Sequence, residues 1–325
     1  MKFKEVFHLP SGRIFMYETD DGYLIESTEM RDVLIKDNYE VRTSQDPRVI
    51  WKALDSYENK WLMTVSTQKG CTHNCKFCDV APLPYKGNLS YREIEKQIEL
   101  LLENTPYVIS SQKAKIGFAR MGEPAHNLRN VVKAITMLPY ISARMGRDIK
   151  WLPCFNTILP MKTEWNESAY HVIDTIIELK EQVCNGFLHF QISCNSTEEN
   201  KRKELFGGAN VLSIEEIVRH INTKDISNRT VTLNFIVMKG VEVSIDKLVS
   251  YGLNKDKFSV KLIPLNSTDN SIVNELETYA NYDNYEDLLR LKRDFESAEI
   301  PVVVDAIAKC EEAGLCCGQL VGGYR

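Results

Sequence analysis

The sequence predicts an α/β fold, a partial (β/α)6 barrel with an N-terminal β extension. Short β-rich runs alternate with segments whose apolar residues have helical spacing. The alternation indicates right-handed βαβ units and a mainly parallel sheet. Because it gives only about six units, the barrel is partial rather than closed with eight strands. The chain has 325 residues, 43% of them hydrophobic, which is enough for a large core.

Residues 1–60 differ from the rest of the chain. The stretch GRIFMYETDDGYLIEST, from Gly12, predicts a β-hairpin that turns at Asp20–Asp21–Gly22. We therefore expect two domains, a β extension over residues 1–60 and a barrel with a C-terminal cysteine segment over residues 61–325.

The expected barrel elements follow in chain order. The strands are predicted at 61–66, 114–120, 149–156, 187–193, 230–238 and 258–265, and a seventh begins at Ile300. Helix starts of the capping-box type, Ser-x-x-Glu, are predicted at Ser90–Glu93, Ser196–Glu199 and Ser213–Glu216.

Composition favours a cytoplasmic protein. The nine cysteines are an odd number and lie mostly in apolar segments, as in a reducing compartment. The N-terminal residues lack a secretory signal, and no apolar run approaches the roughly 18 residues of a membrane span. A net charge of −5 gives no general attraction to nucleic acid, although a local basic patch would still allow an RNA substrate.

Three cysteines, Cys71, Cys75 and Cys78, follow the first predicted barrel strand. In parallel α/β sheets, functional sites gather at the carboxyl ends of strands. A structural zinc site needs four ligands, whereas three cysteines on a 4Fe–4S cluster leave one iron open. Zinc with His73 or Cys154 as the fourth ligand is an alternative, and buried cysteines without a metal are another.

The pattern Cys-x-x-x-Cys-x-x-Cys, with Phe77 before the last cysteine, resembles the radical S-adenosylmethionine (radical SAM) enzymes. This resemblance implies that Cys71, Cys75 and Cys78 hold a 4Fe–4S cluster whose open iron binds S-adenosylmethionine. It also implies that an electron from the cluster cleaves this cofactor to a 5′-deoxyadenosyl radical.

A narrower resemblance covers residues 60 to 322. ARMGEPAHNLRNVV, at 119–132, is similar to the Met-Gly-Glu-Pro-x-x-Asn stretch of the RlmN and Cfr methylases, which methylate ring carbons of adenine in RNA. Further similar segments occur in the same order: GNLSYREI, QISCNSTEENKRKEL, VTLNFIVMKGVEVS, LIPLN and CCGQL.

The resemblance implies a cofactor site at the strand ends. Gly122 would admit the cofactor backbone, and Glu123 would accept hydrogen bonds from its ammonium group. Without the resemblance, these two residues would indicate a tight turn with a solvated glutamate, and Asn195 could cap a helix. The implied cofactor contacts are Gly122, Glu123, Asn156, Ser193, Cys194, Asn195 and Asn266.

In CCGQL, Cys317 matches the family's methyl-carrying cysteine. The resemblance implies that Cys317 receives a methyl group from one S-adenosylmethionine. The radical from a second cofactor molecule then takes hydrogen from the S-methyl group, and the carbon adds to the substrate ring. Another cysteine releases the product by forming a disulfide with Cys317. Vicinal cysteines are otherwise often small buried hydrophobes.

Three features depart from the family pattern. Thr64 stands where the product-releasing cysteine is expected, so Cys194, Cys310, Cys316 or an external thiol would have to act. Cys194 is favoured among them because it ends a predicted barrel strand. Arg120 replaces a glycine before the Met-Gly-Glu stretch. The chain begins near the family's β extension, without its helical N-terminal domain.

These features predict a radical SAM methyltransferase that modifies an unactivated sp² carbon through Cys317. The substrate is an RNA adenine, or else another nucleotide, a peptide or a small molecule, and the electron donor is a protein such as flavodoxin or ferredoxin. One alternative is hydrogen abstraction from a substrate without methyl transfer. Another is a metal-binding module without catalysis.

Overall fold

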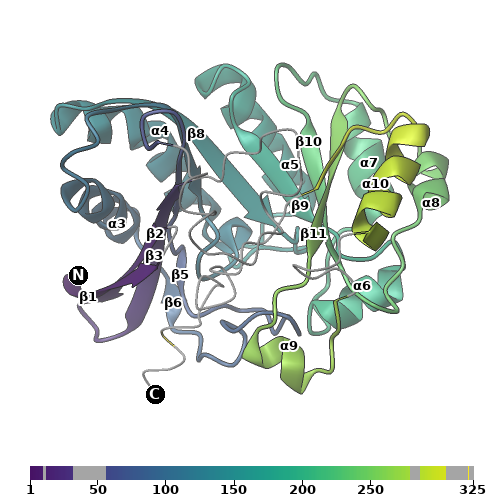
Figure 1. The fold of residues 1–325 in the computed structure, drawn as a ribbon, viewed down its shortest axis with the longest axis horizontal. Helices are drawn as coiled ribbons and strands as arrows, with labels where there is room; N and C mark the ends of the chain where they lie inside the picture. The colour runs from purple at the N-terminus through teal and green to yellow at the C-terminus, as the bar shows by residue number, and fades with distance from the viewer. Residues whose placement is uncertain (10–11, 32–55, 279–285, 305–320, 322–325) are drawn as a thin grey trace. The chain divides into compact units, whose positions relative to one another are not determined.

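A computed structural model describes residues 1–9, 12–31, 56–278, 286–304 and 321 (Figure 1). Within these residues the chain forms two compact units. The first holds residues 1–71, 83–154 and 321, and the second holds residues 72–82 and 155–304. The predicted domain boundary at residue 60 stays a prediction. None of the helices in the described ranges is long and apolar enough to cross a lipid bilayer.

The first unit opens with antiparallel strands. They are β1 (Lys2–Leu9), β2 (Gly12–Glu18) and β3 (Leu24–Arg31), and β3 pairs antiparallel with β4 (Trp61–Thr64). The predicted hairpin is confirmed. Its turn is closed by the amide of Thr19, which donates to the carbonyl of Tyr23 at 2.9 Å, and Gly22 takes a φ of 82°.

Parallel pairing begins at β4. β4 pairs with β7 (Ser110–Gly117), which pairs with β8 (Asp148–Thr157), and the short strands β5 (Gln68–Lys69) and β6 (Gly87–Asn88) form a separate ribbon. The helices are α3 (Tyr91–Glu103), η1 (Pro124–Asn127) and α4 (Leu128–Arg144). The predicted capping box of Ser90 and Glu93 begins α3, and one face of this helix is buried.

The second unit is built from parallel strands and helices. Its sheet has the order β9 (His189–Ser193), β10 (Val231–Val237), β11 (Phe258–Pro264) and β12 (Val302–Val304). Its helices are α5 (Ala169–Glu178), η2 (Leu179–Val183), α6 (Glu199–Leu205), α7 (Ile214–Asn222), α8 (Ile245–Ser250), α9 (Asp269–Val273) and α10 (Glu286–Ser297).

Of the two capping boxes predicted in this unit, one is confirmed and one is wrong. Ser213 and Glu216 form the expected capping box at α7. The expected box at Ser196 is wrong, because α6 begins later, with Glu198 as its N-cap. The hydroxyl of Ser196 instead donates to the carbonyl of Glu242 at 3.2 Å and accepts from the amide of Glu198 at 3.0 Å.

The predicted fold class is confirmed. Each of the seven predicted barrel strands overlaps an observed strand. In the first unit β4 pairs in parallel with β7, and β7 with β8. In the second unit β9, β10, β11 and β12 pair in parallel with one another in that order. The described residues form a mixed α/β fold with a mostly parallel sheet and no closed barrel, as a partial barrel requires.

Candidate functional site

The base of the cysteine loop lies in the first unit, directly after β4. The amides of Thr67 and Gln68 donate to the carbonyl of Met121, at 2.8 and 3.2 Å. The side-chain amide of Asn127 donates to the carbonyls of Thr67 and Leu89, both at 2.7 Å. The Met-Gly-Glu-Pro-x-x-Asn stretch therefore fixes the path of the chain that leads to Cys71.

Gly122 makes this arrangement possible. Its φ is 98°, and a Cβ at this position would lie 2.5 Å from the Cβ of Gln68. Such a contact excludes every side chain, and the positive φ disfavours all residues except glycine. The amide of the next residue, Glu123, donates to Oε1 of Gln68 at 2.9 Å. The structure thus gives Gly122 a packing role that the sequence did not indicate.

Glu123 is buried, with 5% of its surface exposed. Its Oε1 accepts a hydrogen bond from the amide of Ala125 at 3.0 Å and caps η1. A solvated glutamate, the alternative from the sequence, is therefore wrong. The predicted contact of Glu123 with a cofactor ammonium group stays a prediction.

The tip of the loop, residues 72–82, belongs to the second unit. The side-chain amide of Asn270, at the start of α9, donates to the carbonyls of Cys75 and Cys78, at 2.9 and 3.1 Å. Asn274 donates in the same way to the carbonyl of Lys76 at 3.2 Å. Two asparagines that are far away in sequence thus shape the backbone between the second and third cysteines.

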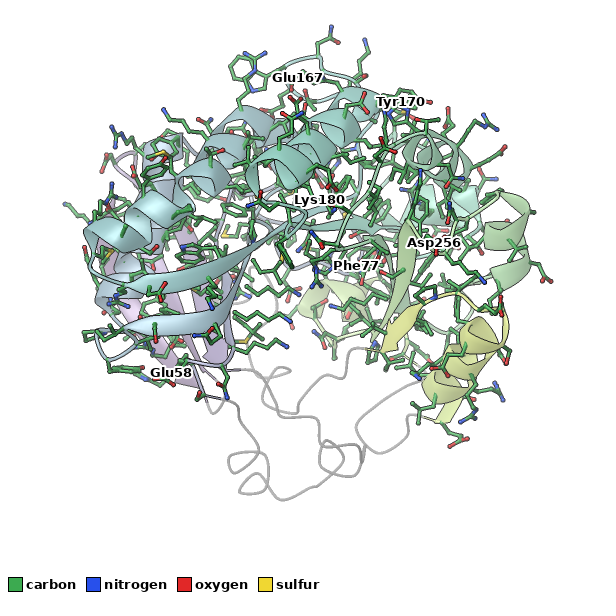
Figure 2. All side chains as sticks on the ribbon, turned by 90° about the horizontal axis from the view of Figure 1, so that it is seen from above. Glu58, Phe77, Glu167, Tyr170, Lys180 and Asp256 are labelled. Atoms are coloured by element: carbon green, nitrogen blue, oxygen red, sulfur yellow. The ribbon has the colours of Figure 1, made fainter. Side chains whose placement is uncertain are left out.

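Two further contacts hold the loop tip. Phe77, labelled in Figure 2, packs edge-on against Phe206, with ring centroids 6.2 Å apart. Gly207 has a φ of 65°, and a Cβ there would lie 2.1 Å from the carbonyl oxygen of Asn74. Because any larger residue would displace the loop, Gly207 fixes its distance from the end of α6.

The thiols fit iron–sulfur chemistry by their type and exposure. Cys71, Cys75 and Cys78 are each partly exposed, and thiolates are the ligands that iron–sulfur clusters use. Within the described ranges, no three Cys, His, Asp or Glu side chains already converge as metal ligands. Cys154 is a buried residue in β8, and its Sγ lies 3.6 Å from the carbonyl oxygen of Leu152.

Asn195 does not cap α6, which was one of the two sequence-based interpretations of its side chain, and its predicted contact with a cofactor stays a prediction. It is buried with a φ of 61°, and its Oδ1 accepts from the amide of Ile236 at 3.1 Å, so it joins the ends of β9 and β10 instead of capping α6. Among the described residues, its Nδ2 has no hydrogen-bond partner. The side-chain Oδ1 of Asn156 is likewise without a partner in the described part of the chain.

The remaining predicted cofactor contacts lie at strand ends in the second unit. Ser193 is the last residue of β9, and Asn266 follows β11; both are partly buried. Cys194 is fully buried, and its Sγ lies 3.7 Å from the carbonyl oxygen of Ile192. Burial raises the pKa of the Cys194 thiol to about 12. The predicted contact of Cys194 with a cofactor stays a prediction.

Other predicted residues are described only in part. Cys310, Cys316 and Cys317 lie outside the described residues. Thr64, at the end of β4, shares a hydrogen bond of 2.6 Å with the hydroxyl of Thr28 on β3. The position expected to release product therefore holds a hydroxyl that is already engaged.

Arg120 is paired with a residue that the sequence did not single out. Its Nη2 lies 2.8 Å from Oε1 of Glu26 on β3, and the two side chains are 2% and 0% exposed. The charge of Arg120 is thus compensated within the first unit. The alternation of β3 could have placed Glu26 on the buried face, but nothing local identified its partner.

A family comparison decides the class of the protein. The model of the radical SAM superfamily matches residues 65–251, more than half of the chain. The chain belongs to the radical SAM superfamily. Membership implies a 4Fe–4S cluster and S-adenosylmethionine as cofactors, which the sequence predicted.

Named relatives add a narrower similarity. The chain is 26% identical over 268 residues to a probable dual-specificity RNA methyltransferase RlmN of Aquifex aeolicus, covering 80% of this chain and 64% of that protein. It is 29% identical over 208 residues to a protein of the same name from Leptospira interrogans, covering 62% and 53%. The chain therefore spans less than two thirds of the length of these two relatives.

A solved structure supports the radical SAM fold. A crystal structure of a radical SAM methyltransferase from Sphaerobacter thermophilus matches with a TM-score of 0.67 and 18% identity. The match covers 98% of this chain and 80% of that one. The partial barrel with its β extension is therefore the radical SAM type predicted from the sequence.

Proposed function

We propose that this radical SAM enzyme methylates an unactivated sp² carbon, of an RNA adenine or another substrate, through an S-methylated Cys317. The cysteine triplet inside the superfamily match carries the radical part of this proposal. The RNA methyltransferase names of the relatives support the methylation part.

Cys71, Cys75 and Cys78 would hold the cluster. When bound, the cluster and S-adenosylmethionine supply a 5′-deoxyadenosyl radical that can take hydrogen from an unactivated carbon. Asn270 orients the loop by its hydrogen bonds to the carbonyls of Cys75 and Cys78. The side chains of these two cysteines therefore extend from a backbone of fixed conformation. A defined ligand loop lowers the entropy lost when metal binds.

Residues at the strand ends would hold S-adenosylmethionine. The carboxylate of Glu123 is fixed by its hydrogen bond to the amide of Ala125, ready to accept from the cofactor's ammonium group. Asn156 and Asn195 each have a buried amide atom without a partner in the described part of the chain, and a polar ligand would satisfy these atoms. The other proposed contacts are Gly122, Ser193, Cys194 and Asn266.

Cys317 would carry the methyl group. Its thiolate would attack the sulfonium methyl of one S-adenosylmethionine, forming an S–CH3 bond as the methyl–sulfonium bond breaks and S-adenosylhomocysteine leaves. After the methylene carbon has joined the substrate, a second thiolate would attack the sulfur of Cys317. The disulfide would form as the S–CH2 bond breaks, and the electron pair of that bond with a proton would complete the methyl group on the substrate. Burial and the raised pKa argue against Cys194 in this step, because few Cys194 side chains are thiolates near neutral pH. Cys310, Cys316 or an external thiol are better candidates.

One observation favours a second candidate, hydrogen abstraction without methyl transfer. Thr64 occupies the position expected for the releasing thiol, and its hydroxyl is bonded to Thr28. A hydroxyl cannot form a disulfide. An enzyme that abstracts hydrogen without methyl transfer forms no adduct with Cys317, so it needs no releasing thiol at position 64. Its substrate would be a small molecule, a nucleotide or a peptide, and flavodoxin or ferredoxin would be a suitable electron donor. Reactive thiols and a cluster favour the reducing cytoplasm.

Mass spectrometry separates the two candidates. The anaerobically reconstituted protein is incubated with S-adenosylmethionine, and peptides with Cys317 are searched for an added methyl group. Labelled methyl groups are then followed into RNA, peptide and metabolite fractions. Methylated Cys317 and a labelled fraction support methyl transfer. Cleavage of S-adenosylmethionine without either result favours hydrogen abstraction, and zinc without iron overturns both.

The Cys317→Ala variant tests the carrier directly. It should still cleave S-adenosylmethionine slowly, because other residues hold the cluster and cofactor, but it should transfer no methyl group. Cys184→Ala is the matched control, because this half-buried cysteine directly follows η2 and is not among the proposed site residues. Normal product from Cys317→Ala would remove Cys317 from the mechanism.

A further inference from the structure

The sheet of the second unit has two faces of different character. On one face, Ile192, Leu233 and Val260 are register partners across β9, β10 and β11, and all three are fully buried. The alternate residues point to the opposite face. Three rows in register cross that face: Gln191, Thr232 and Ser259; then Ser193, Asn234 and Lys261; then Ile236 and Ile263. The first two rows are polar, and the third row is apolar.

Several polar side chains on this opposite face already have partners. The hydroxyl of Thr232 bonds to Nε2 of His189 at 3.0 Å and to the hydroxyl of Ser259 at 3.1 Å. Lys261 also has an interaction of its own. These side chains therefore give no indication of a ligand.

Two side-chain amides on the same face differ from these neighbours. Asn234 is 4% exposed, and its Oδ1 has no hydrogen-bond partner among the described residues. Gln191 is 8% exposed, and within the described ranges its side-chain amide makes no hydrogen bond. The two residues lie on adjacent strands, one row apart. Because buried polar groups without a partner are unfavourable and rare in folded proteins, two neighbouring ones indicate a site for a polar ligand.

The backbone of Asn234 is firmly placed. Its carbonyl oxygen accepts from the amides of Cys194 and Asn195, at 2.8 and 3.3 Å. The side chain therefore extends from a fixed point on a central strand. An amide in a fixed position can select a ligand by the pattern of its donors and acceptors.

We propose that Asn234 and Gln191 bind the base edge of an adenine in the substrate. Oδ1 of Asn234 accepts a hydrogen bond from the exocyclic amino group, and Nδ2 donates to the neighbouring ring nitrogen. A carboxamide matches this pair of groups, which is why Asn and Gln are the common bidentate partners of adenine. The amide of Gln191 donates to a second ring nitrogen.

Two features favour a nucleobase over a charged ligand. Both amides are neutral, so they offer hydrogen bonds but no charge to balance a phosphate or a carboxylate. The next row, Ile236 and Ile263, consists of partly buried apolar side chains. A base has flat apolar faces as well as a polar edge, and enzymes hold an extruded base by hydrogen bonds to its edge and apolar contacts with its faces.

The site names the side chains that would select the substrate of the proposed methylation. Ser193, the register partner of Asn234, is a proposed cofactor contact, so a base on Asn234 lies beside the cofactor. The role of the adenine as a substrate rests on the proposed function, whereas its binding can be measured without turnover.

Equilibrium binding tests the proposal. The anaerobically reconstituted full chain is saturated with S-adenosylmethionine without a reductant, so that the cofactor's own adenine site is filled. It is then titrated with adenosine and with purine riboside, which lacks only the exocyclic amino group, and ligand NMR signals give the affinities. Wild-type protein should bind adenosine about tenfold more tightly than purine riboside, because only adenosine offers the amino group to Oδ1 of Asn234.

Three variants locate the source of this preference. Asn234→Ala should remove it, because the acceptor of the amino group is lost. Gln191→Ala should weaken both ligands severalfold and keep the preference, because its amide contacts a ring nitrogen that both ligands have. Ser259→Ala, whose hydroxyl is bonded to Thr232, is the matched control and should change neither affinity. Thermal unfolding checks that the variants are folded.

The outcomes also separate the sources of the base. Tighter binding of a short adenine-containing RNA than of adenosine supports a base within a chain, and the reverse supports a free nucleoside or nucleotide. Equal affinities for adenosine and purine riboside, an unchanged preference in Asn234→Ala, or no binding of adenosine or RNA overturns the proposal. So does an Asn234→Ala variant that loses affinity only for S-adenosylmethionine. Failure of the proposed methylation would appear instead as an unmodified Cys317 with the preference for adenosine intact.

Discussion

The two units use buried side-chain amides in opposite ways. In the first unit, Gln68 and Asn127 use both ends of their amides in hydrogen bonds that join the cysteine-loop base to neighbouring segments. In the second unit, Asn195 and Asn234 each keep one buried amide atom without a partner among the described residues. The first arrangement supports the fold, and the second is what a ligand site requires before its ligand arrives.

The largest expected effect concerns the loop tip of the second unit. Cys75→Ala should abolish iron binding and all 5′-deoxyadenosine formation, because a ligand is removed. Asn270→Ala keeps every cysteine but frees the carbonyls of Cys75 and Cys78. We expect it to lower iron content several-fold, measured by iron and sulfide analysis. Full iron content in Asn270→Ala would show that the loop needs no support from α9.

The contrast between satisfied and unsatisfied amides predicts that alanine variants of the two kinds of residue lose different amounts of stability. Asn127→Ala removes hydrogen bonds to the carbonyls of Thr67 and Leu89 and should lower the free energy of unfolding by about 3 kcal/mol. Asn234→Ala removes an unsatisfied oxygen and should change it by less than about 1 kcal/mol. Denaturant unfolding of the two variants compares the units directly. Equal losses of unfolding free energy in the two variants would contradict the difference between satisfied and unsatisfied amides.

Two glycines sharpen the comparison. Gly122 and Gly208 have similar φ values, 98° and 84°, but of the two only Gly122 has other atoms within 4 Å of the place that a Cβ would take. Gly122→Ala should lower the free energy of unfolding by about 3 kcal/mol, and Gly208→Ala by about 1 kcal/mol from backbone strain alone. The difference, measured by denaturant unfolding, reports the close approach of Gln68. Similar losses of unfolding free energy in both variants would mean that backbone strain alone causes the destabilisation.

The last expected effect is a pH dependence of the stability of the first unit. Burial lowers the pKa of His126, in η1, from 6.5 to about 4. Between pH 6.5 and 4 the unfolded chain binds a proton that the folded chain does not, so stability falls as pH falls. The slope from this residue is at most about 1.4 kcal/mol per pH unit. His126→Gln should flatten the stability profile in this window, whereas an unchanged profile would assign the acid sensitivity to other groups.

The sequence predicted the features that depend on local patterns. Short β-rich runs located the strands, and the position of the three cysteines placed the candidate cluster loop after β4. The polar alternation in β9 and β10 was visible too, but it would ordinarily predict a solvated face. Only the structure shows that Gln191, Thr232 and Asn234 are buried.

Long-range partners could not be predicted. Asn270 contacts Cys75 across 195 positions, and Glu26 on β3 pairs with Arg120, which follows β7. Arg202, in a basic run that resembles a solvated helix face, is fully buried and donates to the carbonyl of Leu212 at 2.6 Å. Such contacts depend on how elements pack, which helical and strand periods do not encode.

The hold of Asn270 on the cysteine loop sets an order of events during synthesis. Cys75 leaves the ribosome long before residue 270 has been translated, and the amide that orders its carbonyl is then not yet part of the chain. A nascent chain that ends before α9 therefore presents the cysteines on an unshaped segment. Cluster insertion into the shaped loop must await the later part of the barrel, so cluster-assembly proteins would meet a chain that already includes α9.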